Sequence, residues 1–334
     1  MTPFLSDCPK PDTSWRAVVL FGRNVASYKF ALAQSLLEMA ERSTTRVLLS
    51  DLAEPFSRHL CQHLARVDRQ GTSRSSRFLD TCRAFNRDEI TATQLRDATT
   101  KLGFVNVIDA FHMVGKGPVP HRFFVDERTA GGPPAIRLTD ELYKLRERFR
   151  ADDLADETEA RWRLVEGAWQ YDLPRANVAV QLDSETQELF VQKVRRVSLS
   201  RVRPSLNGYQ KGHCFYCGCD MPLAAADVDH FFPWMLRERG LMPDADGIWN
   251  LVLACRDCNR GEGGKFASVP SDRLVARLHA RNSWLVESHH PLRETIMLQT
   301  GQSEEARRSF LRSRQQIARD ALIHTWEPAE EHHD

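Results

Sequence analysis

Two pairs of cysteines at Cys-x-x-Cys spacing, Cys214/Cys217 and Cys255/Cys258, stand with 37 residues between them. Thiolates at this spacing can each occupy one edge of a zinc ion, and four of them close a tetrahedral site that has no open position for water. Gly218, directly after the first pair, suits the tight backbone turn of such a zinc knuckle. The sequence therefore predicts a structural zinc site on these four cysteines.

Four polar residues inside or beside these cysteines could take part in a reaction: Asp229, His230, Asn250 and Asn259. The segment VDHFFPW places a carboxylate and an imidazole side by side at the end of a short apolar strand. The segment NLVLACRDCN places Asn250 at the start of a second strand and Asn259 directly after the fourth cysteine, where a helix can begin. Because four thiolates leave the zinc no catalytic role, any reaction here depends on the polar residues.

The combined pattern, C-x2-C … DH … P … N-L-x3-C-x2-C-N, covers about residues 205–268 and resembles the HNH endonuclease family. The resemblance implies a ββα-metal fold with a four-cysteine zinc knuckle. It makes His230 the general base that activates water against the scissile phosphate. It implies that Asp229 and Asn259 hold one divalent ion, Mg²⁺ or another metal. Asn250 would brace the loop that orients the histidine. The chemistry is consistent, because a neutral imidazole accepts a proton near pH 7 and a hard ion stabilises charge on phosphorus.

The chain departs from the family pattern just after Asn259. The family has two residues and then a basic one, whereas Glu262 stands at that spacing in this chain. Arg260 and Lys265 flank it within the glycine-rich segment RGEGGK. We therefore expect the basic contact to the nucleic-acid phosphate at Arg260 or Lys265 instead.

The segment 192–213 leads into the first cysteine pair and contains no acidic residue. Its candidate nucleic-acid contacts are Arg195, Arg196, Arg201, Arg203 and Lys211. Two interpretations stay open for it. It is either a solvated helix that enters the next domain, or a phosphate-contacting approach to the site that follows.

The composition is that of a soluble globular protein, with 42% hydrophobic and 27% charged residues. The formal net charge is only +1, so any affinity for nucleic acid must come from a local patch. No run reaches the roughly 18 to 20 apolar residues that a membrane span needs, and the N-terminus lacks the pattern of a secretion signal. We expect a cytoplasmic protein with no membrane partner, a setting in which clustered cysteines bind metal rather than form disulfides.

The 334 residues are long enough for two or more parts, and we expect an α+β chain. Residues 1–191 are predicted to form an N-terminal α+β domain for recognition or regulation, which resembles no family we can identify. Residues 192–270 are predicted to form the HNH nuclease domain with its basic lead-in helix. Residues 271–334 are predicted to form a helical extension that packs on the nuclease domain.

The pattern also predicts several local elements. Short apolar runs predict strands at 15–21 and 104–114, and amphipathic spacing predicts a helix at 152–170. Alternation around residues 183–186 predicts a hairpin.

The function favoured by these residues is a metal-dependent endonuclease that nicks or cuts DNA. The alternative is a non-catalytic, zinc-stabilised adaptor that binds nucleic acid and would keep binding without His230. A further hypothesis gives the N-terminal domain a protein partner or a small signal that activates the chain. HNH proteins with an unassigned extra domain resemble bacterial restriction or anti-phage defence effectors, and the resemblance suggests that context.

Overall fold

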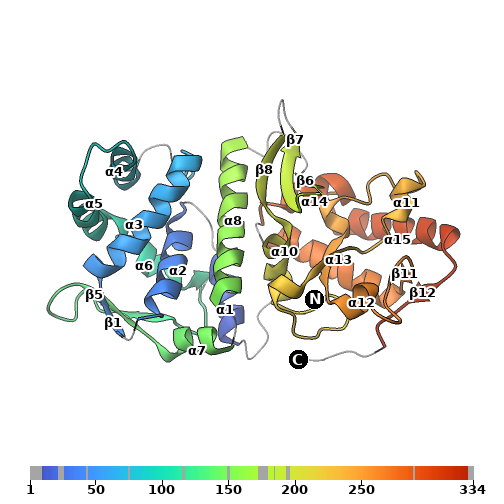
Figure 1. Cartoon of the computed structure of the whole chain (residues 1–334), viewed down its shortest axis with the longest axis horizontal. Coiled ribbons are helices and arrows are strands. Elements are labelled where there is room, and N and C mark those ends of the chain that lie inside the picture. Colours follow the sequence, from blue (N-terminus) through green and yellow to red (C-terminus); the bar gives the residue numbers. More distant parts are fainter. Residues whose placement is uncertain are drawn as a thin grey trace. The chain divides into compact units, whose positions relative to one another are not determined.

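The structure, a computed structural model, shows two compact units, Thr2–Tyr171 and Asp172–Asp334, here called the N-terminal and C-terminal units. Both mix helices with small sheets, which confirms the expected α+β class (Figure 1). The boundary lies at residue 171 rather than 191, and the cysteine region shares one unit with the helices that follow it. The described residues are 10–21, 26–42, 44–73, 76–114, 117–148, 151–171, 180–183, 185–192, 196–288 and 290–329.

The N-terminal unit is mainly helical, with one three-stranded antiparallel sheet of order β1-β5-β4. Its helices are α1 (Pro11–Phe21), α2 (Tyr28–Met39), α3 (Leu49–Arg66), α4 (Arg77–Asn86), α5 (Ala92–Ala98), the π-helix η1 (Thr99–Gly103), α6 (Val107–Phe111), α7 (Asp140–Arg148) and α8 (Ala151–Tyr171). Its strands are β1 (Arg46–Leu48), β2 (Met113–Val114), β3 (Gly117–Pro118), β4 (Phe124–Asp126) and β5 (Ala135–Leu138).

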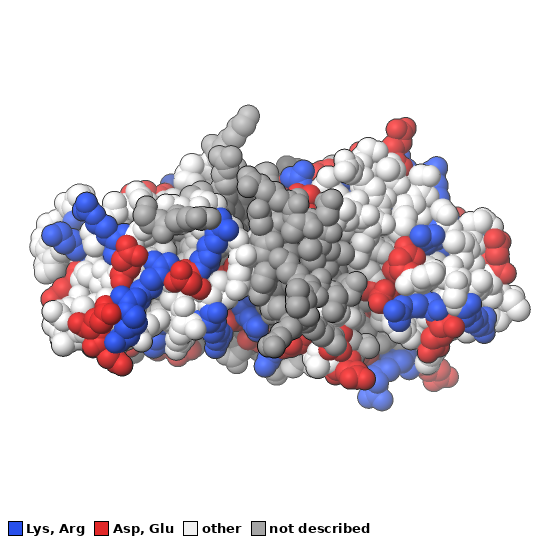
Figure 2. Space-filling model, turned by 90° about the horizontal axis from the view of Figure 1, so that it is seen from above, with Lys and Arg blue, Asp and Glu red and all other residues white. Residues whose placement is uncertain are grey.

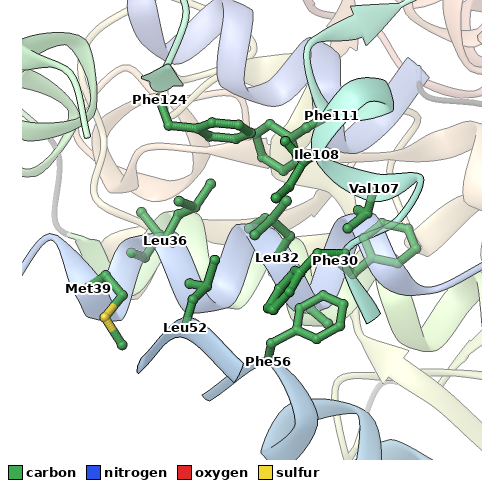
Figure 3. Packing of buried hydrophobic residues seen from close by; sticks show 14 of the residues in the cluster. Phe30, Leu32, Leu36, Met39, Leu52, Phe56, Val107, Ile108, Phe111 and Phe124 are labelled. Carbon is green, nitrogen blue, oxygen red and sulfur yellow. The ribbon is translucent and has the colours of Figure 1, made fainter. Parts of the chain in front are cut away.

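One hydrophobic core lies under these elements. Leu32 and Leu36 of α2 stand one turn apart and meet Leu52 and Phe56 of α3, with Phe111 of α6 on the other side (Figure 3). Each of these five side chains is fully buried. Burial of this apolar surface gives the unit its own source of stability.

Two segments predicted as strands are not strands. Residues 15–21 belong to α1, and residues 104–114 form a turn and α6, with only the last two residues in a strand. A short apolar run that is buried on all sides looks the same in a strand and in a helix. In α1 the helical spacing also lets Arg16 pair with Asp12 one turn before it, at 2.8 Å.

The described residues of the C-terminal unit form three small sheets and several helices (Figure 1). Its strands are β6 (Val180–Asp183), β7 (Glu188–Gln192), β8 (Arg196–Arg201), β9 (Asp227–His230), β10 (Leu251–Ala254), β11 (Val269–Pro270) and β12 (Thr325–Trp326). Its helices are α10 (Val202–Gln210), η2 (Leu223–Ala225), α11 (Met235–Glu238), η3 (Ile248–Asn250), α12 (Arg256–Arg260), α13 (Asp272–Glu287), α14 (Arg293–Thr300) and α15 (Glu304–Ala321). The hairpin predicted around residues 183–186 is formed by β6 and β7. The lead-in segment predicted as a helix is strand β8 followed by α10.

Strands β9 and β10 run antiparallel and are followed directly by α12. His230 at the end of β9 lies opposite Leu251 at the start of β10. The side chain of Gln210, at the end of α10, bonds to the backbone of β10. It accepts from the Leu253 N–H at 2.8 Å and donates to the Leu253 carbonyl at 2.7 Å. A side-chain amide thus takes the place of a third strand at this point.

Helix α13 holds both the strand pair and the cysteine loop by arginine side chains. Arg281 is buried and donates to the carbonyl oxygens of Leu251 at 2.7 Å and Trp249 at 3.2 Å. Arg277 donates to the carbonyl oxygen of Tyr216 at 2.6 Å. Among the described residues, no helix is long and apolar enough to cross a membrane.

Candidate zinc centre and active site

The four predicted zinc ligands meet in the structure. The sulfur atoms of Cys214, Cys217, Cys255 and Cys258 all lie within 4.8 Å of one another. The Cys217 and Cys255 sulfurs are 3.9 Å apart, close to the edge of about 3.8 Å that a tetrahedron of 2.3 Å zinc–sulfur bonds requires. Gly218 has a φ of 78°, the left-handed turn expected after the first pair. The cluster could therefore hold a metal such as zinc.

The thiols of this cluster shift one another's pKa through hydrogen bonds. A hydrogen bond from the Cys258 thiol lowers the pKa of Cys214 to about 5, and Cys214 also accepts the backbone N–H of Cys255 at 3.3 Å. The pKa of Cys258 is raised in return. A metal ion binds cysteine in its deprotonated form, so a thiol of low pKa that lies among three other sulfur atoms suits a metal site.

Asp229 is buried in β9, and its Oδ2 carries two contacts. It accepts the Tyr216 hydroxyl at 2.5 Å and lies 3.1 Å from the Lys265 ammonium. Burial raises the pKa of Asp229, while Lys265 and Tyr216 oppose that rise. Neither of these two contacts involves Oδ1.

Lys265 reaches Asp229 because of the glycines before it. A Cβ on Gly261 would lie 2.6 Å from the Cα of Asp257, and a Cβ on Gly264 would lie 2.7 Å from the Asp257 carbonyl oxygen. Only glycine fits this return of the chain beneath α12. Lys265 is fully buried, and its ammonium also donates to the His230 carbonyl at 3.0 Å. Its charge is directed at protein atoms rather than at solvent.

His230 lies at the end of β9, where its ring is tilted against Trp234 with 4.9 Å between centroids. Its Nε2 atom is enclosed and has no hydrogen-bond partner among the described residues. Burial lowers the pKa of His230 to about 4, and the charges of Lys265 and Arg237 add to the effect. The imidazole is therefore neutral at pH 7, the state that a proton acceptor requires.

Asn250 is fully buried and uses its amide to hold the loop that follows His230. Its Oδ1 accepts the Phe232 N–H at 2.8 Å. Its Nδ2 donates to the carbonyls of Phe232 at 3.0 Å and Ala245 at 2.7 Å. These bonds join the loop to the start of β10, the bracing geometry that the resemblance implies for this residue.

Asn259 lies in α12 beside Asp227, not in hydrogen-bond contact with Asp229 among the described residues. Its Nδ2 donates to Asp227 at 3.1 Å, and Arg260 lies 2.9 Å from the same carboxylate. Among the described residues, the amide oxygen of Asn259 has no hydrogen-bond partner comparable to the one that its Nδ2 has. Sequence reasoning missed Asp227, although residues two apart on a strand share a face and so mark Asp227 and Asp229 as a pair.

The basic candidates of the lead-in segment are only partly described. Arg195 lies outside the described residues, as does the side chain of Arg196 in β8. Arg201 is exposed, whereas Arg203 and Lys211 are half-buried. On the face drawn in Figure 2, Lys and Arg side chains are interspersed with Asp and Glu among the coloured residues and form no single basic field. A solvated helix is therefore not what the described part of this segment forms, because strand β8 precedes α10 and most residues of α10 are buried. Contact with nucleic-acid phosphates stays a prediction.

Comparison of the chain with protein-family models, with curated proteins and with solved structures finds no match. The interpretation of the site accordingly rests on its residue types and their geometry.

Proposed function

We propose that the chain is a metal-dependent endonuclease of the HNH type that hydrolyses phosphodiester bonds in DNA. The observation that carries the proposal is the neutral imidazole of His230, whose Nε2 atom has no hydrogen-bond partner among the described residues. Asp227 and Asp229 lie on the same strand as His230, β9, and Asn259 lies on α12. The β9–β10–α12 succession and the neighbouring cysteine cluster support the same proposal.

In this proposal His230 takes a proton from water as the water oxygen bonds to phosphorus. The bond from phosphorus to the leaving sugar oxygen breaks, and that oxygen takes a proton from solvent. Oδ1 of Asp229 and the amide oxygen of Asn259 would hold a divalent ion, Mg²⁺ or another, which would supply positive charge beside the phosphate. Asp227 orients the Asn259 amide through the bond to its Nδ2, which makes Asp227 a positioning residue.

The metal requirement tests this proposal. Purified protein is incubated with supercoiled plasmid in Mg²⁺, in EDTA at a concentration that leaves the cysteine-bound metal in place, and in EDTA followed by excess Mg²⁺. Nicked or linear plasmid should appear with Mg²⁺, vanish with EDTA and return with the added ion. Cleavage that is equal in all three conditions would exclude a catalytic role for an exchangeable ion.

One observation favours the alternative, a non-catalytic adaptor that binds nucleic acid. The Lys265 ammonium neutralises the charge of Asp229 without a metal ion. This is what a purely structural ion pair in an adaptor would do. An adaptor would bind DNA with strong dependence on salt and would leave plasmid intact with Mg²⁺, Mn²⁺, Ni²⁺ or Co²⁺. A role in restriction or anti-phage defence remains part of the nuclease proposal. So does activation through a partner of the N-terminal unit.

A further inference from the structure

The N-terminal unit contains a cavity of about 710 Å³ that has no part in the proposed nuclease site. It lies along α3 and is closed by the end of α4 and by α5. Pockets of roughly 300–1,000 Å³ are the size that binds small organic molecules. Every residue that lines it belongs to this one unit.

Small side chains on one face of α3 create the hollow. Ser57, Cys61 and Ala65 recur at every fourth position, so they line up along the helix. Leu95 of α5 and Phe85 of α4 form the facing wall. Leu95 is buried and Phe85 half-buried, so the inner part of the cavity is apolar.

The rim carries three guanidinium groups against two carboxylates, Asp51 and Glu54. Arg42 and Arg58 each lie 3.9 Å from Glu54, so their charges are shared with it. Asp51 stands in the first turn of α3, where the positive end of the helix dipole favours a negative charge.

Arg96, in α5, is the remaining charge. It is exposed at the cavity wall and makes no ion pair among the described residues. An unneutralised guanidinium beside an apolar hollow favours a ligand with an anionic head and an apolar body.

We propose that this cavity binds an amphipathic organic anion. The apolar chain or ring lies over Cys61, Phe85 and Leu95, and the acidic head group contacts Arg96. The proposal is independent of the nuclease function, because it concerns a separate unit and a binding readout.

Calorimetry of the full chain with decanoate, decyl phosphate and decylammonium tests the charge preference. The two anions should bind and the cation of equal length should not, and the difference between the two anions identifies the preferred head group. Affinity should rise about fourfold for each methylene from octanoate to decanoate. Binding of decylammonium as tight as that of decanoate, or no binding of either anion, would overturn the proposal.

Arg96→Gln should weaken decanoate binding by about tenfold, whereas Arg77→Gln should leave it unchanged. Arg77 is the matched control, since it is an exposed arginine at the start of α4 that does not line the cavity. Equal weakening by both variants would mean that the head group is attracted by overall charge only.

The alkylation rate of Cys61, which lines the cavity, shows where the ligand binds. Cys82, which is buried and does not line the cavity, is the comparison. Saturating decanoate should slow the alkylation of Cys61 by iodoacetamide at least fivefold, as measured by peptide mass spectrometry. Ala65→Trp, a substitution at an exposed position of α3, should abolish decanoate binding by filling the cavity. Unchanged alkylation of Cys61, or undiminished binding by a folded Ala65→Trp variant, would place the ligand elsewhere and refute the site.

Discussion

Lys265 and Asp229 form a buried ion pair at the centre of the candidate active site. The lysine is fully buried, and the carboxylate has an 8% exposed fraction. Neither charge can reach bulk water, so each depends on the other for its solvation. The same pair sets the orientation of Oδ1, the atom proposed to bind the divalent ion.

Lys265→Met should therefore destabilise the C-terminal unit by about 3 kcal/mol, because it leaves Asp229 buried without a counter-charge. Urea denaturation at pH 7, followed by the fluorescence of the tryptophans, measures the change. Lys101→Met, at an exposed position of the N-terminal unit, is the control and should change the free energy of unfolding by less than about 0.5 kcal/mol. Equal stability of the Lys265→Met protein and wild type would show that the pair contributes nothing.

We expect His112 to make the stability of the N-terminal unit depend on pH. Its Nε2 accepts the backbone N–H of Phe123 at 2.9 Å, and burial lowers the pKa of His112 to about 4, with the charges of Arg122 and Lys29 adding to the effect. His112 therefore stays unprotonated in the folded state at a pH near 6.5, at which it binds a proton in the unfolded state. Stability should be fully present above that pH and should fall by about 2 kcal/mol between pH 7 and pH 5.

Urea denaturation of wild type and His112→Phe at both pH values measures this dependence. The variant is less stable at pH 7, because the Phe123 N–H loses its acceptor, but it should lose about 2 kcal/mol less than wild type on acidification. Parallel losses in the two proteins would assign the pH dependence to other histidines, such as His59.

At the residue scale, spacing was enough to predict the cysteine cluster, because Cys-x-x-Cys pairs leave little freedom. The partners of the acids could not be predicted in the same way. Asp227 and Asp229 share a strand face, and which of them meets Asn259 depends on where α12 lies. The role of Lys265 depends on a glycine loop whose path is visible only in three dimensions.

At the scale of elements, the cysteine cluster joins the loop after α10 to the start of α12. Cys255 is the N-cap residue of α12, and its sulfur accepts the Cys258 N–H at 3.4 Å. Helix α12 has only five residues, too few to be stable alone, so the cluster must hold it. Asn259 and Arg260 are carried by this helix and depend on the same cluster.

Cys255→Ser should therefore remove the bound metal and lower the melting temperature, whereas Cys219→Ser should do neither. Cys219 is the matched control, since it lies in the same loop but outside the cluster. Elemental analysis should find about one zinc per chain in wild type and in Cys219→Ser. Loss of zinc from both variants, or from neither, would contradict a four-cysteine site.

Element prediction succeeded where the pattern was long or strictly alternating, as in α8 and in the β6–β7 hairpin. It failed at residues 15–21 and 104–114, because short apolar runs fit a strand and a buried helix equally well. It also could not anticipate Arg281 or Gln210, polar side chains that satisfy backbone groups of β10. Such bonds join elements far apart in sequence and leave no local pattern.

At the scale of the whole molecule, the two proposals concern different units of the chain. All proposed nuclease residues belong to the C-terminal unit, and the 710 Å³ cavity belongs to the N-terminal unit. The helices α13 to α15 share the compact unit of the strand pair, so the C-terminal extension is part of the body that carries the site. We thus propose cutting for the C-terminal unit and ligand binding for the N-terminal unit.

The central claim is that His230 is the general base of a nuclease. Plasmid cleavage in Mg²⁺ is followed under single-turnover conditions for wild type, His230→Ala and His324→Ala, an exposed histidine outside the site. Filter binding in Ca²⁺ checks that all three bind DNA equally. We predict that His230→Ala cleaves about 10²- to 10⁴-fold more slowly than wild type, while His324→Ala matches wild type. Equal cleavage rates for wild type and His230→Ala would contradict the claim.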